Sequence, residues 1–114
     1  MALVNLTRGT VVARRVRSAD TFFKRIAGLL AGPPLGSEEA LVIPSVCPQV
    51  HTFFMRYAID CVFLNRDNRV VGVETLVPWR FSGVYPRADR VVELTQGALR
   101  RSQTAMGDKL EFEH

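Results

Sequence analysis

The chain has 114 residues, a formal charge of +4 and an apolar fraction of 47%. These values fit one globular domain and exclude a disordered chain. No apolar run approaches the roughly 20 residues of a membrane span, and the first residues lack the basic head and apolar stretch of a secretory signal. We therefore expect a single soluble domain over residues 1–114, with its core over about 10–113, located in the cytoplasm.

The first half of the chain predicts short strands and one helix. Residues 10–17 begin with β-branched side chains, which favours a strand with one charged face. A helix is predicted from Ser18 or Asp20 to residue 30, because apolar residues recur there at spacings of three and four before Gly32-Pro33-Pro34. Further strands are expected at residues 40–43 and 50–55.

The second half predicts a hairpin followed by less regular structure. Residues 59–64 are a continuous apolar run, typical of a strand buried on both faces. Residues 65–69 favour a tight turn to an antiparallel strand at 70–73. Residues 77–86 are interrupted by Pro and Gly and are expected to be irregular. The remaining elements expected are a strand at 90–94, a short helix at 96–103 and a closing strand at 109–113.

Together these elements are about six or seven short strands and two short helices, without regular β-α-β alternation. The pattern indicates a mainly β chain, α+β by content. It favours a small single-domain β-barrel-like fold over a doubly wound one.

The positive charge is concentrated near the N-terminus. Residues 1–25 hold six of the 15 basic residues but one of the eleven acidic ones. Such a face suits an anionic partner, and a protein or nucleic-acid interaction module is therefore one alternative. The segment lacks the interleaved aromatic residues of a single-strand binding platform, so we do not expect nucleic acid to be the partner.

The most informative segment runs from residue 47 to residue 60. Asp60 interrupts an apolar run, and a buried carboxylate costs several kcal/mol unless it is paired or hydrogen-bonded. The candidate partners are His51, Thr52, Arg56 and backbone amides. One hypothesis is a polar pocket formed by these groups. The other is that Asp60 fastens its own turn while His51 belongs to the core or its rim.

Trp79 and Arg80 also have two interpretations. A tryptophan beside an arginine on a loop is typical of a binding hot spot, and the pair could close the pocket around His51. Alternatively, Trp79 covers the core as a lid and Arg80 stacks or pairs nearby.

Two cysteines, Cys47 and Cys61, are too few for a disulfide framework. Cys61 is expected to be a small core residue. Cys47, His51 and Asp60 have the residue types of a thiol nucleophile, a base and an orienting acid, but no nucleophile motif surrounds Cys47. The spacing also lacks the paired ligands of a zinc site. We therefore assign no catalytic residue, no metal and no cofactor.

The chain resembles the family known as domain of unknown function 192, from about residue 10 to residue 113. The resemblance rests on Arg25-Ile26-Ala27-Gly28-Leu29, on Val50-His51-Thr52-Phe53-Phe54-Met55-Arg56-Tyr57-Ala58-Ile59-Asp60 with Val62-Phe63-Leu64, and on Val70-Val71, Val91-Val92-Glu93-Leu94, Gly97 and Gly107-Asp108. It implies a compact β-barrel-like fold with short helices, and it implies no reaction.

The leading hypothesis is a binding or accessory domain for a small anionic ligand or a protein partner. Its site would be lined by His51, Thr52, Arg56 and Asp60, with Trp79 and Arg80 above them. The alternative is a hydrolase or transferase that uses His51 as base, with or without Cys47 as nucleophile.

Overall fold

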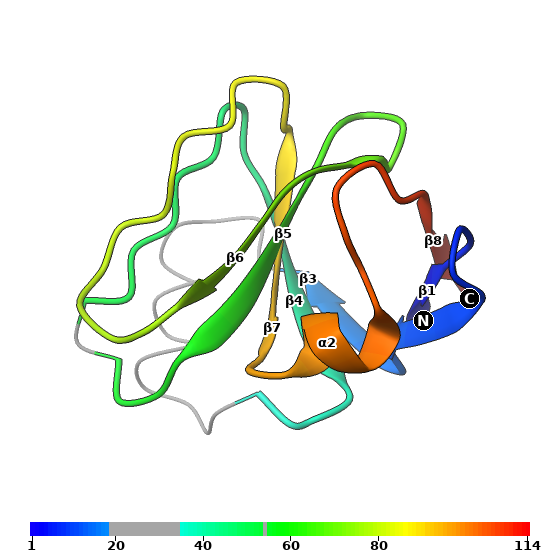
Figure 1. Ribbon diagram of the computed structural model, residues 1–114, viewed down its shortest axis with the longest axis horizontal. Helices are drawn as coiled ribbons and strands as arrows, with labels where there is room; N and C mark the ends of the chain where they lie inside the picture. The colour runs from blue at the N-terminus through cyan, green and yellow to red at the C-terminus, as the bar shows by residue number, and fades with distance from the viewer. Residues whose placement is uncertain (19–34, 54) are drawn as a thin grey trace.

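The computed structural model describes residues 1–18, 35–53 and 55–114 (Figure 1). Strands are the main regular structure in these residues, as the sequence predicts. The elements are β1 (Ala2–Asn5), β2 (Thr10–Ala13), β3 (Arg15–Ser18), β4 (Glu39–Pro44), β5 (Ile59–Leu64), β6 (Val70–Leu76), β7 (Arg90–Thr95), α2 (Ala98–Ser102) and β8 (Leu110–Glu113).

The strands form two sheets. One sheet has the order β2-β1-β8, and the other has the order β3-β4-β7-β5-β6. All pairs are antiparallel except β3 with β4. Neither sheet closes on itself, so the barrel expected from the sequence is wrong. Strand periodicity shows which residues form strands but not whether the edge strands meet.

The predicted hairpin is confirmed, and its first strand is buried on both faces. Side chains of β5 alternate between two apolar clusters: Ile59, Cys61 and Phe63 pack in one, while Val62 and Leu64 pack in the other. The five-stranded sheet therefore separates two halves of the core. This alternation also decides which half each polar residue of β5 faces.

The predicted single strand at 10–17 divides at Arg14. Residues before it pair with β1, and residues after it pair with β4. The backbone amides of Arg14 and Arg15 both donate to the carbonyl of Glu38, at 2.8 and 3.0 Å. The chain thereby leaves one sheet and enters the other. The first strand of the smaller sheet, β1, lies outside the expected core of 10–113.

The strand expected at 50–55 is wrong, since the described part of this segment has only one isolated bridge, between His51 and Phe81. The predicted helix at 96–103 is present but shorter, and it starts after Gly97 rather than at residue 96. The predicted helix ending at residue 30 lies outside the described residues.

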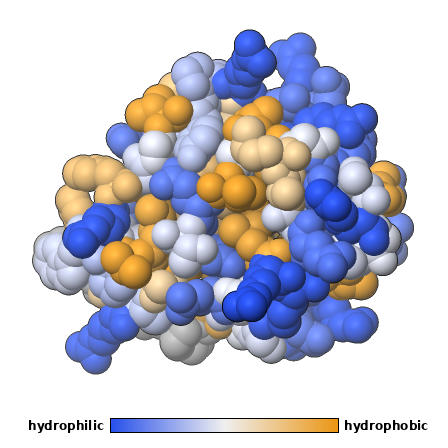
Figure 2. All heavy atoms as spheres, viewed as in Figure 1, coloured by the Kyte–Doolittle hydropathy of each residue, from blue (hydrophilic) through white to orange (hydrophobic). Residues whose placement is uncertain are grey.

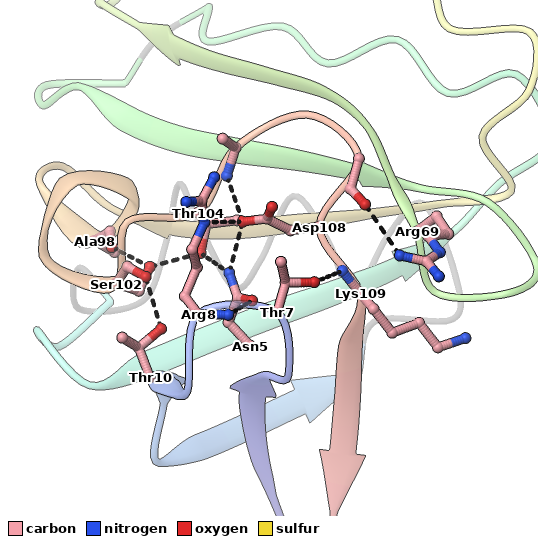
Figure 3. A network of polar contacts seen from close by, with 12 residues as sticks. Asn5, Thr7, Arg8, Thr10, Arg69, Ala98, Ser102, Thr104, Asp108 and Lys109 are labelled. Carbon is pink, nitrogen blue, oxygen red and sulfur yellow. Dashed lines mark hydrogen bonds and ion pairs between the residues drawn. The ribbon is translucent and has the colours of Figure 1, made fainter.

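A polar network ties the two ends of the chain together (Figure 3). Asn5 in β1 donates from Nδ2 to Asp108 at 3.0 Å and to Thr104 at 3.2 Å. Arg8 also contacts the Asp108 carboxylate, at 3.2 Å. Because Asn5 and Asp108 are both buried, this network fixes the smaller sheet to the turn before β8.

Gly72 in β6 leaves room for an aromatic ring. A Cβ atom at this position would lie 2.1 Å from Cε1 of Tyr85. The Tyr85 ring is stacked on Phe63 with centroids 4.0 Å apart, and its hydroxyl donates to Glu74 at 2.6 Å. Burial, together with Glu74, raises the pKa of Tyr85 to about 12, so the hydroxyl stays a donor at neutral pH.

We expect Gly72→Ala to lower the free energy of unfolding by about 2 kcal/mol, because the fixed Tyr85 ring has to move. Urea denaturation of the variant measures the loss. The same substitution in a Tyr85→Ala background is the control and should cost much less. Equal losses in both backgrounds would show that the clash with Tyr85 is not the cause.

Candidate functional site

Two loops, 45–53 and 77–88, lie side by side and carry most of the expected site residues (Figure 1). Val50 and Ser82 join them, because the Val50 amide donates to Ser82 Oγ at 2.9 Å and the Ser82 amide donates to the Val50 carbonyl at 2.7 Å. The Thr52 amide donates to the Arg80 carbonyl at 2.9 Å. Hydrogen bonds between the two loops therefore hold them in a fixed arrangement.

Thr52 is the residue that organises the contact. Its side chain is fully buried, and its hydroxyl donates to the Val77 carbonyl at 2.7 Å. The same hydroxyl oxygen accepts a bond from the Arg80 amide at 2.9 Å. The backbone carbonyl of Thr52 accepts a bond from the Trp79 amide at 3.0 Å. Thr52 thus acts as a support beneath residues 77–80 rather than as a group that meets a ligand.

Four rings gather above this support. Phe53 stacks on Trp79 with centroids 5.9 Å apart and meets Phe81 edge-on at 4.7 Å. His51 lies 5.1 Å from the Phe53 ring and 6.4 Å from the Phe81 ring. We name these four residues the aromatic cluster. Trp79 and Phe81 remain 53% and 58% exposed, which is unusual for residues of this size.

The backbone of Trp79 is strained. Its φ is 66°, in the left-handed region that bulky residues rarely adopt. The cost of such a conformation is about 1–2 kcal/mol, and strained residues concentrate at functional sites. The backbone of Trp79 is held in this conformation by its hydrogen bond to Thr52. The side chain of the next residue, Arg80, is exposed and donates to the Trp79 carbonyl at 3.3 Å.

Apolar side chains are also exposed beside the aromatic cluster. Val77 and Val84 on the second loop are 48% and 55% exposed. In Figure 2 apolar groups lie among hydrophilic ones on the left of the face, where Figure 1 places these loops. These two side chains lie on the same loop as Trp79 and Phe81.

Asp60 is buried and hydrogen-bonded, but its partners are not the expected side chains. It is 2% exposed, and its Oδ1 accepts the Thr75 hydroxyl at 2.7 Å. Its Oδ2 accepts the backbone amides of Gly97 at 3.0 Å and Leu99 at 3.1 Å. Asp60 therefore caps helix α2, whose own N-cap residue is a glycine.

The structure does not join Asp60 to His51 or Arg56. By the alternation along β5, Asp60 faces the same half of the core as Val62, whereas Val50, next to His51, packs in the other half. Arg56 is exposed and makes no hydrogen bond or ion pair within the described residues. Of the six expected residues, His51, Thr52, Trp79 and Arg80 are brought together.

The cysteines are free and differ in environment. Cys47 is exposed, and its amide donates to the Ala88 carbonyl at 3.0 Å, while Cys61 is buried in the core as expected. No group of three His, Cys, Asp or Glu residues in the described ranges could hold a metal ion. No helix in those ranges is long and apolar enough to cross a membrane.

Glu93 is a buried charged residue that the sequence analysis did not single out. It lies in β7 opposite Cys61 and Leu41 and is fully buried. Burial raises the pKa of Tyr57, and the Glu93 charge raises it further while Arg17 opposes the shift. Glu93 interrupts an apolar run as Asp60 does, so the sequence could have indicated a buried charge there too. The sequence analysis did not single out Phe53, which is partly exposed, or Phe81, which lies in the segment expected to be irregular.

The fold and the site define a small, mostly β protein with a cluster of partly exposed aromatic rings. The chain belongs to the DUF192 family, described as uncharacterized ACR, whose profile matches residues 3–112. It is 36% identical to a UPF0127 protein of Pyrococcus furiosus over 96% of this chain and 97% of that one. A UPF0127 protein of Thermococcus sibiricus is 34% identical over 97% of this chain and 74% of the relative.

Two solved structures share the fold. One is a protein of unknown function from Novosphingobium aromaticivorans, with a TM-score of 0.81, 24% identity and coverage of 97% of this chain and 83% of the other. The second, from Sinorhizobium meliloti, is described as a proposed transcription regulator and has a TM-score of 0.73, 19% identity and coverage of 96% and 89%. At these identities the likeness concerns the fold.

Proposed function

We propose that the protein is a binding domain whose aromatic cluster takes a small anionic ligand with a planar ring. The observation that carries the proposal is the strained Trp79, held at a φ of 66° with its indole half-exposed and stacked on Phe53. Folding alone favours neither the strain nor the exposure. Both are accounted for if the ring is presented to a ligand.

The chemistry of the neighbouring groups defines the ligand class. A planar ring would stack on the exposed face of the Trp79–Phe53 pair, which is an interaction worth about 1–3 kcal/mol for nucleic-acid bases. The exposed guanidinium of Arg80 would donate charge-assisted hydrogen bonds to the anionic group. Arg56, exposed in the same segment as His51, could supply a second cation. Asp60 would contribute only to the stability of the domain, by holding helix α2 to β5.

The only tryptophan of the chain lies in this site, so its fluorescence reports binding directly. We expect phenyl phosphate to quench Trp79 with saturation, and inorganic phosphate, which has no ring, to quench it little. Arg80→Gln should weaken the affinity for phenyl phosphate about tenfold, since a hydrogen bond to a charged group contributes about 1.5–3 kcal/mol.

Arg87→Gln is the matched control. Arg87 is an exposed arginine of the same loop and makes no ion pair within the described ranges. Its replacement should leave the affinity within about twofold of the wild type, as expected for a distant, screened charge. Equal weakening in the two variants, or no quenching by phenyl phosphate at millimolar concentration, would contradict the proposal.

A nucleic-acid function through the N-terminal basic face has less support. Arg8 is paired with Asp108 at 3.2 Å, and Arg14 with Glu38 at 3.0 Å. Arg17 lies 3.9 Å from Glu39. Because carboxylates accompany these arginines, the face presents less net positive charge than its sequence indicates.

A thiol enzyme that uses Cys47, His51 and Asp60 also has less support. The Asp60 carboxylate is hydrogen-bonded to Thr75 and to the first amides of helix α2, so it does not orient His51.

A further inference from the structure

A concave site that shares no residue with the aromatic cluster lies beside strand β2. A groove of about 380 Å³ runs between strand β2, the turn at residues 37–38 and the last turn of α2. Residues 11–13 line one wall, and Arg14, Ser37, Glu38 and Arg101 supply its polar groups. We call it the β2–α2 groove. Its volume is within the range of ligand pockets, about 300–1,000 Å³.

Two guanidinium groups in this groove are positioned by the protein itself. Arg14 donates from Nε to Glu38 Oε1 at 3.0 Å. Arg101 donates from Nη2 to the Ser37 carbonyl at 2.7 Å. A guanidinium has five N–H donors in a fixed plane, so each arginine keeps most of its donors while one bond orients it. Two oriented guanidinium groups in one groove favour the binding of an oxyanion.

We propose that the β2–α2 groove binds a phosphate monoester, with Arg14 and Arg101 on the phosphate oxygens and the Ser37 hydroxyl as a further donor. Among the described residues, Glu38 is the only acidic side chain lining the groove, and its bond to Arg14 is an exposed ion pair with little net stability. A dianion can therefore contact the remaining donors of both guanidinium groups, in competition with Glu38 for Arg14. Val11 and Val12 offer an apolar wall to the organic part of the ester.

This inference does not depend on the proposed function, because the groove shares no residue with the aromatic cluster. Glycerol 3-phosphate tests it separately, since this ester has no ring to stack on Trp79. We expect isothermal titration calorimetry to detect binding at one site per chain at constant ionic strength. Arg101→Gln should weaken that binding about tenfold or more.

Two further variants make the test specific. Arg100→Gln makes the same change of charge on the neighbouring position of α2, but Arg100 does not line the groove, so the affinity should stay within about twofold. Glu38→Gln removes the competing carboxylate and should tighten binding several-fold. Circular dichroism verifies that all variants remain folded.

The outcomes separate the two proposals. Loss of binding in Arg101→Gln with retention in Arg100→Gln and Arg80→Gln supports the groove. Equal weakening in Arg100→Gln and Arg101→Gln would mean a diffuse charge effect and would overturn it. So would the absence of binding at about 10 mM glycerol 3-phosphate, or an affinity that falls in Glu38→Gln. None of these results bears on quenching of Trp79 by phenyl phosphate.

Discussion

Asp60→Ala is expected to lower the free energy of unfolding by about 3–4 kcal/mol. The substitution leaves the amides of Gly97 and Leu99 without their acceptor, and each unsatisfied buried donor costs about 1–3 kcal/mol. Thr75 loses less, because its exposed hydroxyl can turn to water. Urea denaturation monitored by circular dichroism at pH 7 measures the loss.

Two comparisons test the cause. Asp60→Asn keeps one acceptor oxygen in place of two and loses the negative charge that strengthens the bonds from Gly97 and Leu99, so an intermediate loss is expected. His51→Ala removes a partly exposed ring and should cost about 1 kcal/mol. Small and equal losses for Asp60→Ala and His51→Ala would mean that Asp60 does not anchor helix α2.

Asp60 illustrates how far the sequence could go. A carboxylate inside an apolar run indicates a buried, satisfied charge without further information. Two of its partners, however, are backbone amides at sequence separations of 37 and 39 residues. Backbone amides were among the candidate partners, but backbone groups leave no signature in the sequence, so the sequence did not indicate which amides Asp60 would bind. The burial was predictable, and the partners were not.

The aromatic cluster was hidden for a related reason. Each of its residues lies in an irregular segment, and the two segments are joined by hydrogen bonds from Thr52 and Ser82 rather than by a regular strand pair. The sequence analysis offered Trp79 and Arg80 above a pocket around His51 as one of two interpretations, but it did not include Phe53 or Phe81. Their proximity depends on tertiary structure, as does the division of residues 10–17 between two sheets at Arg14.

Asp108 connects the ends of the chain in a way that depends on pH (Figure 3). Its Oδ2 accepts bonds from Asn5 Nδ2 at 3.0 Å, the Ala105 amide at 3.0 Å and Arg8 Nε at 3.2 Å. Burial alone would raise the pKa of Asp108, but the bonds from Asn5, Ala105 and Arg8 outweigh it and lower the pKa. The ionised carboxylate therefore stabilises the folded state.

The sign of the pH dependence follows from that lowered pKa. An unfolded aspartate titrates near pH 3.9, so the Asp108 contribution is complete above about pH 5 and falls as the pH drops through the lower folded pKa. We expect Asp108→Asn to lower the free energy of unfolding by about 3 kcal/mol at pH 7, because three donors lose a charged acceptor. The gap to the wild type should narrow at pH 3.

Asp67→Asn is the matched control for this prediction, because Asp67 is an exposed aspartate whose carboxylate makes no hydrogen bond or ion pair within the described residues. It should leave the free energy of unfolding within about 0.5 kcal/mol of the wild type at both pH values. Urea denaturation of the three proteins at pH 7 and pH 3 gives the comparison. If the gap between wild type and Asp108→Asn were the same at both values, the network would act through shape alone, and the charge on Asp108 would have no part in joining β1 to the turn before β8.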